Sequence, residues 1–293
     1  MTKIAVVGTK DGWSSEKLTD TVAQATGRRI FVEMEKTRID LEGGHAWSGD
    51  IDLMEMDAIM IKKVGTRYSP DLLDRLELLR YVNNAGVPVF SAPERLIRVV
   101  DRLSCTVSMK SAGIPMPPTT ITEALDAACA AVTSYGQAVV KPLYTSKARG
   151  MLLLESGPNL ETVLAEYKEE NSIFYIQKKI DIKEHDLGIA FLGGHYLTTY
   201  ARKKTNNAWH TTTRSGGRYV RVDPPDAVID LAHRAQALFG LDFTCVDVAL
   251  TENGPVVFEV SAFGGFRGIE EARGLDPATL YTEYVLKRIG HAD

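Results

Sequence analysis

The sequence predicts a mixed α/β protein with two domains, and three observations support this fold class. The first 95 residues or so alternate apolar, strand-like runs with amphipathic helical stretches, a pattern typical of a small doubly wound domain. Later strand-like runs are joined by short turns, which favours antiparallel pairing. The 293 residues, 44% of them hydrophobic and 25% charged, are enough for a substantial core.

The N-terminal domain is expected to end near residue 95. No G-x-G-x-x-G motif follows its first strand, so a dinucleotide site at that turn is not expected. Its expected elements, in order, are a strand at 3–8, a helix at 14–24, strands at 29–33 and 57–64, a helix at 70–85 and a strand at 87–90.

The second domain is expected to begin with one long helix over 94–112, which Gly113 ends. Gly193-Gly194 and the segment 252–255 indicate turns between paired strands. The remaining expected elements are a helix at 121–133, strands at 138–142, 172–180, 187–193 and 196–202, a helix at 226–239, and strands at 245–251 and 256–260.

Composition and charge argue against several classes of partner. A formal net charge of −4 gives no basic surplus, so neither nucleic acid nor a membrane surface is an expected partner. The apolar stretch after Lys3 is too short for a signal peptide or a membrane span, so a cytoplasmic protein is expected. We interpret Cys105, Cys129 and Cys245, which show no C-x-x-C spacing, as small buried hydrophobic residues.

Two acids and one lysine are the first candidates for a functional site. Asp247 and Glu259 lie among apolar residues on two strands of a predicted hairpin. Because a buried carboxylate needs a partner, the pair holds a divalent cation such as Mg²⁺ or is neutralised by arginine or lysine side chains. Lys141 ends an apolar strand before a polar loop, where it faces phosphate groups or extends into solvent.

Several motifs occur in a characteristic order along the chain. The tail Gly254-Pro255-Val256-Val257-Phe258-Glu259-Val260-Ser261-Ala262-Phe263-Gly264-Gly265 is similar to the pattern G-P-x-x-x-E-V-N-x-x-P-G. Asp57 to Gly65, Asp101-Arg102, Val140-Lys141, Ile176 to Ile180, His185-Asp186 and Val246-Asp247 precede it. In this order the motifs resemble the RimK-like ligases of the ATP-grasp superfamily, from about residue 57 to the end.

The resemblance implies an ATP-grasp fold and a nucleotide site. The pre-ATP-grasp domain would cover 1–95 and the ATP-grasp domain 96–293, with a small lobe at about 115–180 and a large lobe for the remainder. Two cations would neutralise phosphate charge, and main-chain groups near the end of the small lobe would bind adenine. The implied nucleotide-binding residues are Arg102, Lys141, Ser146, Lys147, Gln177, Lys178, Ile180 and Asp186.

The resemblance also implies metal ligands, catalytic residues and a reaction. Asp247, Glu259 and Ser261 would hold Mg²⁺, or Mn²⁺ in its place, and Arg202 and Arg214 would position phosphate and substrate. A substrate carboxylate would attack the γ-phosphorus of ATP to give ADP and an acyl phosphate, which an amine then displaces.

The implied substrate is an amino acid, a peptide or a protein tail. Arg202, Arg214 and Arg267 favour an anionic one. Family members often form dimers or tetramers, so a homo-oligomer is a further expectation.

The sequence departs from the family pattern at several positions of the site. Ser261 replaces the usual Asn ligand, and Gly188 replaces an arginine. Only Gly150 clearly remains of the glycine-rich loop, in which Lys147 and Arg149 contact phosphate or are solvated.

Two further functions therefore stay open beside the ligase: an ATP-grasp kinase for a small molecule, and a nucleotide-binding sensor without turnover. The retention of Lys141, Asp247 and Glu259 argues against the sensor. A kinase and a ligase differ in their products, a phosphate ester and an amide.

Overall fold

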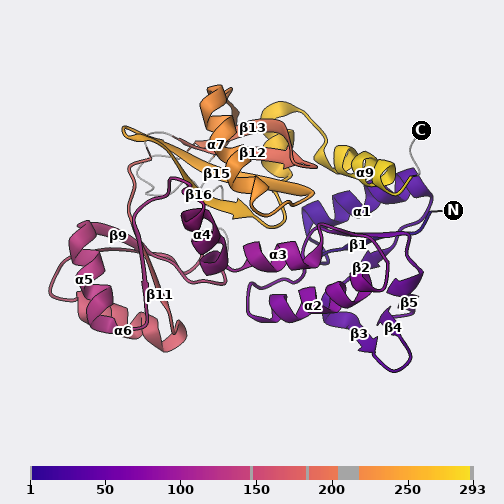
Figure 1. Cartoon of the computed structure of the whole chain (residues 1–293), viewed down its shortest axis with the longest axis horizontal. Helices are drawn as coiled ribbons and strands as arrows, with labels where there is room; N and C mark the ends of the chain where they lie inside the picture. The colour runs from indigo at the N-terminus through magenta and orange to yellow at the C-terminus, as the bar shows by residue number, and fades with distance from the viewer. Residues whose placement is uncertain (1, 146–147, 183–184, 204–217, 291–293) are drawn as a thin grey trace.

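The computed structural model describes residues 2–145, 148–182, 185–203 and 218–290. An N-terminal parallel sheet lies at one end of the molecule, a small antiparallel sheet at the other, and a large antiparallel sheet between them (Figure 1). The first and last described elements, β1 (Ile4–Val7) and α9 (Pro277–Arg288), both lie at the end of the molecule that holds the N-terminal sheet. Within the described ranges, no helix is long and apolar enough to cross a membrane.

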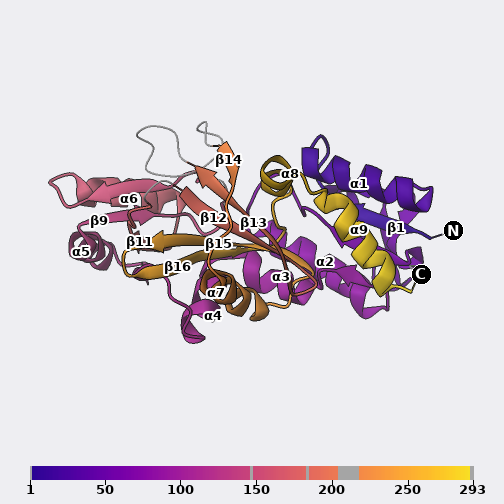
Figure 2. The ribbon, with the colours of Figure 1, turned by 90° about the horizontal axis from the view of Figure 1, so that it is seen from above.

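The N-terminal sheet is parallel, with strand order β2-β1-β6-β7. One face of β1 packs on helix α2 (Asp71–Asn84), and the other packs on α1 (Trp13–Thr26) and the C-terminal α9 (Pro277–Arg288). Figure 2 shows helices on both sides of this sheet. The doubly wound prediction is therefore confirmed, although α9 was not predicted. The strands are β1 (Ile4–Val7), β2 (Phe31–Val32), β6 (Ala58–Ile61) and β7 (Val89–Phe90).

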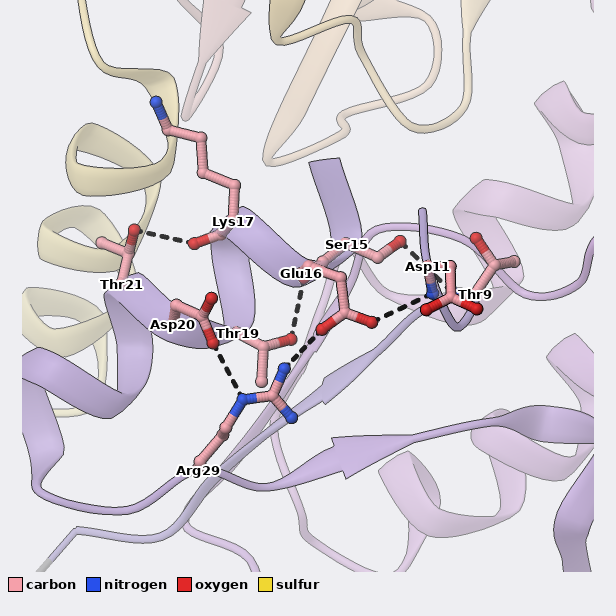
Figure 3. A network of polar contacts seen from close by, with 9 residues as sticks. All are labelled: Thr9, Asp11, Ser15, Glu16, Lys17, Thr19, Asp20, Thr21 and Arg29. Atoms are coloured by element: carbon pink, nitrogen blue, oxygen red, sulfur yellow. Dashed lines mark hydrogen bonds and ion pairs between the residues drawn. The ribbon is translucent and has the colours of Figure 1, made fainter. Parts of the chain in front are cut away.

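Polar contacts connect helix α1 to the loop after β1 and to the start of β2 (Figure 3). Ser15 Oγ accepts a hydrogen bond from the main-chain N–H of Thr9 (3.2 Å). Arg29 donates from Nε to Asp20 (2.8 Å) and also pairs with Glu16. Because these ion pairs are partly exposed, they orient the helix more than they stabilise the fold.

A three-stranded antiparallel sheet between β2 and β6 was not predicted. Its strands are β3 (Thr37–Asp40), β4 (His45–Ser48) and β5 (Ile51–Asp52), with 3-10 turns η1 (Met34–Lys36) and η2 (Leu53–Glu55) beside them. Asp52 holds the sheet edge, because it pairs with His45 Nδ1 (2.6 Å) and accepts from the N–H of Met54 (3.0 Å).

The single helix predicted over 94–112 was wrong, because the structure has two: α3 (Pro93–Val100) and α4 (Arg102–Ser111). Asp101 between them has an extended backbone (φ −88°, ψ 122°) and caps α4 by accepting from the N–H groups of Leu103 and Ser104. Residue 95 lies within α3, which packs against α2. The domain and lobe limits stay predictions.

The small antiparallel sheet has the order β10-β9-β11-β8 and carries two helices. Its buried cluster uses only residues between Ala128 and Ile176 and is separate from the other clusters. The predicted helix at 121–133 begins too early, since β-branched Thr119–Thr122 forms a strand. The elements are β8 (Thr119–Thr122), α5 (Leu125–Tyr135), β9 (Gln137–Val140), β10 (Leu152–Glu155), α6 (Leu160–Glu170) and β11 (Phe174–Lys178).

The large sheet has the order β14-β13-β12-β15-β16, and every pairing is antiparallel. Gly193 and Gly194 have φ values of 59° and 84° and join β12 to β13, so the predicted turn between these strands is confirmed. The elements are β12 (His185–Leu192), β13 (His195–Lys203), β14 (Arg218–Arg221), α7 (Asp226–Ala237), β15 (Phe243–Thr251), β16 (Gly254–Ser261) and α8 (Arg267–Arg273).

Candidate active site

A cavity of about 390 Å³ lies between the small sheet, the large sheet and the carboxyl end of β6. Every predicted site residue within the described ranges lines it. These residues are Arg102, Lys141, Gln177, Lys178, Ile180, Asp186, Arg202, Asp247, Glu259 and Ser261. The predicted Ser146, Lys147 and Arg214 lie outside the described residues.

Lys141 faces the cavity from the end of β9. Its main-chain N–H donates to the carbonyl of Tyr175 (2.9 Å), and its Nζ donates to Gln177 Oε1 (2.6 Å). Burial and the nearby Arg102 charge lower the pKa of Lys141 to about 7, although Glu259 acts in the opposite direction. A nucleotide phosphate would supply the negative charge that favours the protonated form.

Arg102 holds the loop that follows β9. Its guanidinium donates to the main-chain carbonyls of Pro142 and Thr145, and the distance to the Thr145 oxygen is 3.3 Å. On the adjacent strand, the N–H groups of Lys178 and Lys179 are used within the sheet, donating to the carbonyls of Pro118 and Gln137. These two N–H groups are therefore not available to a ligand.

The carboxylates lie on neighbouring strands of the large sheet. Asp247 on β15 is opposite Glu259 on β16, and Asp186 on β12 is opposite Arg202 on β13. Arg202 donates to both Asp186 oxygens and lies 3.0 Å from Asp247 Oδ2. Burial raises the pKa of Asp247, and the charges of Glu259 and Asp186 add to this effect while Arg202 opposes it. Two carboxylates therefore share one guanidinium, and the third, Glu259, lies opposite Asp247 on the neighbouring strand.

This charge balance fits a divalent cation. In the part of the chain that the structure describes, no group of three or more His, Cys, Asp or Glu residues forms a metal site by itself. Asp247, Glu259 and Ser261 therefore offer Mg²⁺ only part of its oxygen shell. Magnesium commonly completes such a shell with substrate phosphates and water, so the residues fit a metal that binds together with a nucleotide.

The replacement of the family's arginine by Gly188 has a packing explanation. Gly188 is opposite Tyr200 on β13 and Asp247 on β15. A Cβ at position 188 would lie 2.4 Å from Tyr200 Cζ, and one at Gly268 would lie 2.5 Å from the same ring. The buried Tyr200 ring therefore occupies the space beside both glycines.

Two lysines at the end of β6 were not predicted as site residues. Lys62 Nζ donates to the main-chain carbonyls of Phe263 (2.6 Å) and Gly264 (2.5 Å), just beyond Ser261. Lys63 lines the cavity itself. The signal in the sequence was two adjacent cations at the carboxyl end of a buried parallel strand, the edge where ligands commonly bind.

The geometry agrees with comparisons to known proteins. Residues 99–285, more than half of the chain, match the RimK-like ATP-grasp domain. The chain belongs to the RimK-like ATP-grasp family.

Named relatives of this RimK-like protein include two kinds of glutamate ligase. The tetrahydromethanopterin:alpha-L-glutamate ligase of Methanosarcina acetivorans is 25% identical over 81% of this chain and 82% of its own. A probable alpha-L-glutamate ligase of Legionella pneumophila is 23% identical over 98% and 96%.

Solved structures of ATP-grasp proteins share the fold. The ligase PsnB, complexed with a phosphomimetic variant of its minimal precursor, Mg and ADP, has a TM-score of 0.75 at 17% identity, over 98% of this chain and 99% of that one. A RimK domain ATP-grasp protein from Sphaerobacter thermophilus has a TM-score of 0.74 at 20% identity, over 97% and 99%. The predicted ATP-grasp fold is therefore confirmed.

Proposed function

We propose that this RimK-like protein uses ATP and Mg²⁺ to join a carboxylate of an anionic substrate to the amine of L-glutamate. The general activity, ATP-dependent ligation of a carboxylate to an amine, follows from membership of the family and agrees with the relatives' names. The observation that carries the proposal is one cavity that places Lys141 opposite the carboxylates Asp247 and Glu259. Glutamate is proposed because the relatives of known name are glutamate ligases.

The nucleotide is assigned to the small sheet and the loop after β9. Lys141 would contact the phosphates, and Arg102 would hold the Pro142–Thr145 carbonyls in place beside them. The main chain from Gln177 to Ile180 would bind adenine. Asp186 already pairs with Arg202, so we assign it to orienting that guanidinium rather than to the ribose.

Asp247, Glu259 and Ser261 would hold the metal, for which Mn²⁺ is an acceptable substitute because it accepts the same oxygen ligands. Bound there, the metal would neutralise charge on the terminal phosphates during transfer. Ser261 offers a neutral oxygen, as the usual Asn does, but it is a shorter and weaker ligand. This replacement lowers the expected metal affinity. The PsnB structure with Mg and ADP supports this assignment through the fold alone.

The reaction proceeds in two displacements. A carboxylate oxygen attacks the γ-phosphorus, the bond to the β-phosphate oxygen breaks, and ADP leaves. The amine then attacks the acyl carbon of the resulting acyl phosphate, and inorganic phosphate leaves as the amide forms. Arg202, fixed by Asp186 and Asp247, would offset negative charge on the transferring group. The cavity walls would keep water away from the acyl phosphate.

The experiment that tests the function is ADP release by the purified protein with ATP, Mg²⁺ and L-glutamate. A panel of small organic acids and acidic peptides supplies the carboxylate, and products are resolved by mass. We expect ADP release that needs both substrates, with a condensation product. A stable phosphate ester would instead indicate a kinase. Nucleotide binding without ADP release under any condition would indicate a sensor.

Three further expectations stay proposals: a cytoplasmic location, a homo-oligomeric assembly and the anionic character of the substrate.

A further inference from the structure

Lys63 is a cation at the wall of the cavity that no assigned role uses. It follows β6 at the carboxyl end of the N-terminal parallel sheet, and its side chain is half-buried. Its Nζ lies 5.6 Å from the ring centroid of Tyr68 and 5.6 Å from that of Phe263, and all three residues line the cavity. The N-terminal domain thus brings a positive charge to the site of the ATP-grasp domain.

No carboxylate of the described chain pairs with Lys63. Its contacts there are the two aromatic rings, which leave the ammonium without an anionic partner. Burial lowers the pKa of Lys63, and the nearby Arg149 charge adds to this effect. An ammonium in such a position is stabilised when an anion binds beside it.

Lys63 lies at the metal end of the cavity rather than at the adenine end. Phe263 follows Ser261 by two residues. Burial raises the pKa of Tyr68, and the nearby Glu259 charge adds to this effect, so Tyr68 lies close to Glu259. An anion beside Lys63 would therefore be close to the phosphate that is transferred.

The arginines that favoured an anionic substrate do not fill this role within the described chain. Arg202 is paired with Asp186 and Asp247. Arg267 does not line the cavity, and it lies 5.0 Å from the Trp13 ring centroid and 3.9 Å from Glu271.

We propose that Lys63 binds the carboxylate of the substrate that is phosphorylated, with Tyr68 and Phe263 as the apolar walls of this subsite. The proposal rests on the ligase function. The ammonium would reduce the repulsion between the carboxylate and the ATP phosphates, and it would place the carboxylate from the N-terminal domain while the ATP-grasp domain holds the nucleotide. The carboxylate oxygen stays the nucleophile, since a hydrogen bond to the ammonium uses one of its lone pairs only.

Lys63→Met tests this in steady-state kinetics with the panel carboxylate that gives a condensation product. We expect the KM for that carboxylate to rise at least tenfold, while the dissociation constant of ATP stays within about twofold. Lys63→Arg, which keeps the charge, should recover most of the loss. Lys36→Met is the matched control, because Lys36 is exposed and pairs only with Glu33. An unchanged KM for the carboxylate, or a tenfold weaker binding of ATP, would overturn the proposal.

A second measurement needs no turnover, so it separates failure of this subsite from failure of the ligase function. The labelling of Lys63 by acetic anhydride is followed by mass spectrometry in protein saturated with Mg²⁺ and a non-hydrolysable ATP analogue. We expect glutarate and the panel acids to protect Lys63, and the uncharged glutaramide to give no protection. If the nucleotide alone protected Lys63 fully, or if no acid protected it, the anion at Lys63 would not be a substrate carboxylate.

Discussion

Three acids around one arginine set the electrostatics of the cavity. Asp186, Asp247 and Glu259 carry more negative charge than Arg202 neutralises, and burial already raises the pKa of Asp247. A divalent cation would correct this imbalance. The arginine alternative thus holds for Asp247, whereas Glu259 forms no ion pair within the described chain and its role as a metal ligand stays a prediction.

Glu259→Ala tests the metal assignment. We expect loss of turnover and of Mg²⁺-dependent nucleotide binding, because the site would keep only Asp247 and Ser261 as ligands. Circular dichroism and calorimetric titration of ATP with and without Mg²⁺ would report fold and binding. Glu123→Ala, at an exposed acid just before α5, is the control. Normal activity of the Glu259 variant would remove Glu259 from the metal site.

Lys141→Ala tests the phosphate assignment. We expect the dissociation constant of ATP to rise at least tenfold, about 1.4 kcal/mol or more, because the ammonium that faces the cavity is lost. Lys168→Ala, on the exposed face of α6 in the same lobe, should leave ATP binding unchanged. If both variants bound ATP as the parent does, Lys141 would have no part in the site.

The sequence could predict residues of the second domain that line the cavity, because their motifs are local and ordered. Lys141, Asp247 and Glu259 all line the cavity. It could not predict that Arg202 bonds to Asp186 or that Tyr200 fills the space beside Gly188, since these contacts depend on strand register. Lys63 was missed because Phe263, one of the two rings that it contacts, is 200 residues distant in the sequence.

At the scale of elements, one lysine joins β6 to the loop after β16. Lys62 is 2% exposed. Its Nζ donates hydrogen bonds to two main-chain carbonyls and also lies 3.9 Å from the Phe266 ring centroid. Gly264 in that loop has φ 45°, and a Cβ there would lie 2.5 Å from the Phe243 ring. Lys62 and these rings therefore fix the chain just after Glu259 and Ser261, the proposed metal ligands.

The Lys62 junction predicts a pH-dependent stability. Burial, with the Lys63 charge, lowers the pKa of Lys62 to about 7, whereas an unfolded lysine has a pKa of about 10.4. Between these values Lys62 holds its proton more firmly in the unfolded chain, so the contribution of Lys62 to the free energy of unfolding should rise with pH from about 7 to 10. Lys62→Met should reduce this slope by about 0.5–1 kcal/mol per pH unit.

Urea unfolding of the parent and of Lys62→Met at several pH values in that range measures the slope, with Lys36→Met as the exposed control. Lys62→Met also leaves the carbonyls of Phe263 and Gly264 without their hydrogen bonds, which lowers the stability at every pH. The change of stability with pH does not depend on this loss, so the two slopes can be compared. Equal slopes in the parent and in Lys62→Met would show that Lys62 is not neutralised in the folded protein.

Most strands and helices were predicted within a few residues. The elements that were not predicted are β3 to β5, β8, β10, α6, β14, α8 and α9, and α3 and α4 were predicted as one helix. The helix break at Asp101 was hidden because α3 and α4 share one continuous apolar pattern. The short strands β3 to β5 have mixed burial and a half-exposed character, which gives little periodic signal. Helices α8 and α9 follow the tail motif and pack on earlier elements of the chain. Their position therefore depends on tertiary contacts, which the local sequence does not reveal.

At the scale of the molecule, the N-terminal sheet and the large sheet share buried clusters, whereas the small sheet has its own. Helix α9 returns the end of the chain to α1, and Lys17 of α1 pairs with Glu270 (2.8 Å) and Asp276 (3.3 Å). The large sheet and the N-terminal domain are therefore one packed unit, with the nucleotide wall opposite. This arrangement would bring a substrate held at Lys63, as proposed, to the phosphates of a bound nucleotide.

The central claim is that a substrate carboxylate attacks the γ-phosphorus of ATP and that an amine then displaces the phosphate. The direct measurement is ligation with a carboxylate labelled with ¹⁸O on both oxygens, followed by mass analysis of the inorganic phosphate. We predict one ¹⁸O atom in each phosphate released and one retained in the amide. Phosphate free of label, or a phosphorylated substrate in place of the amide, would contradict the account.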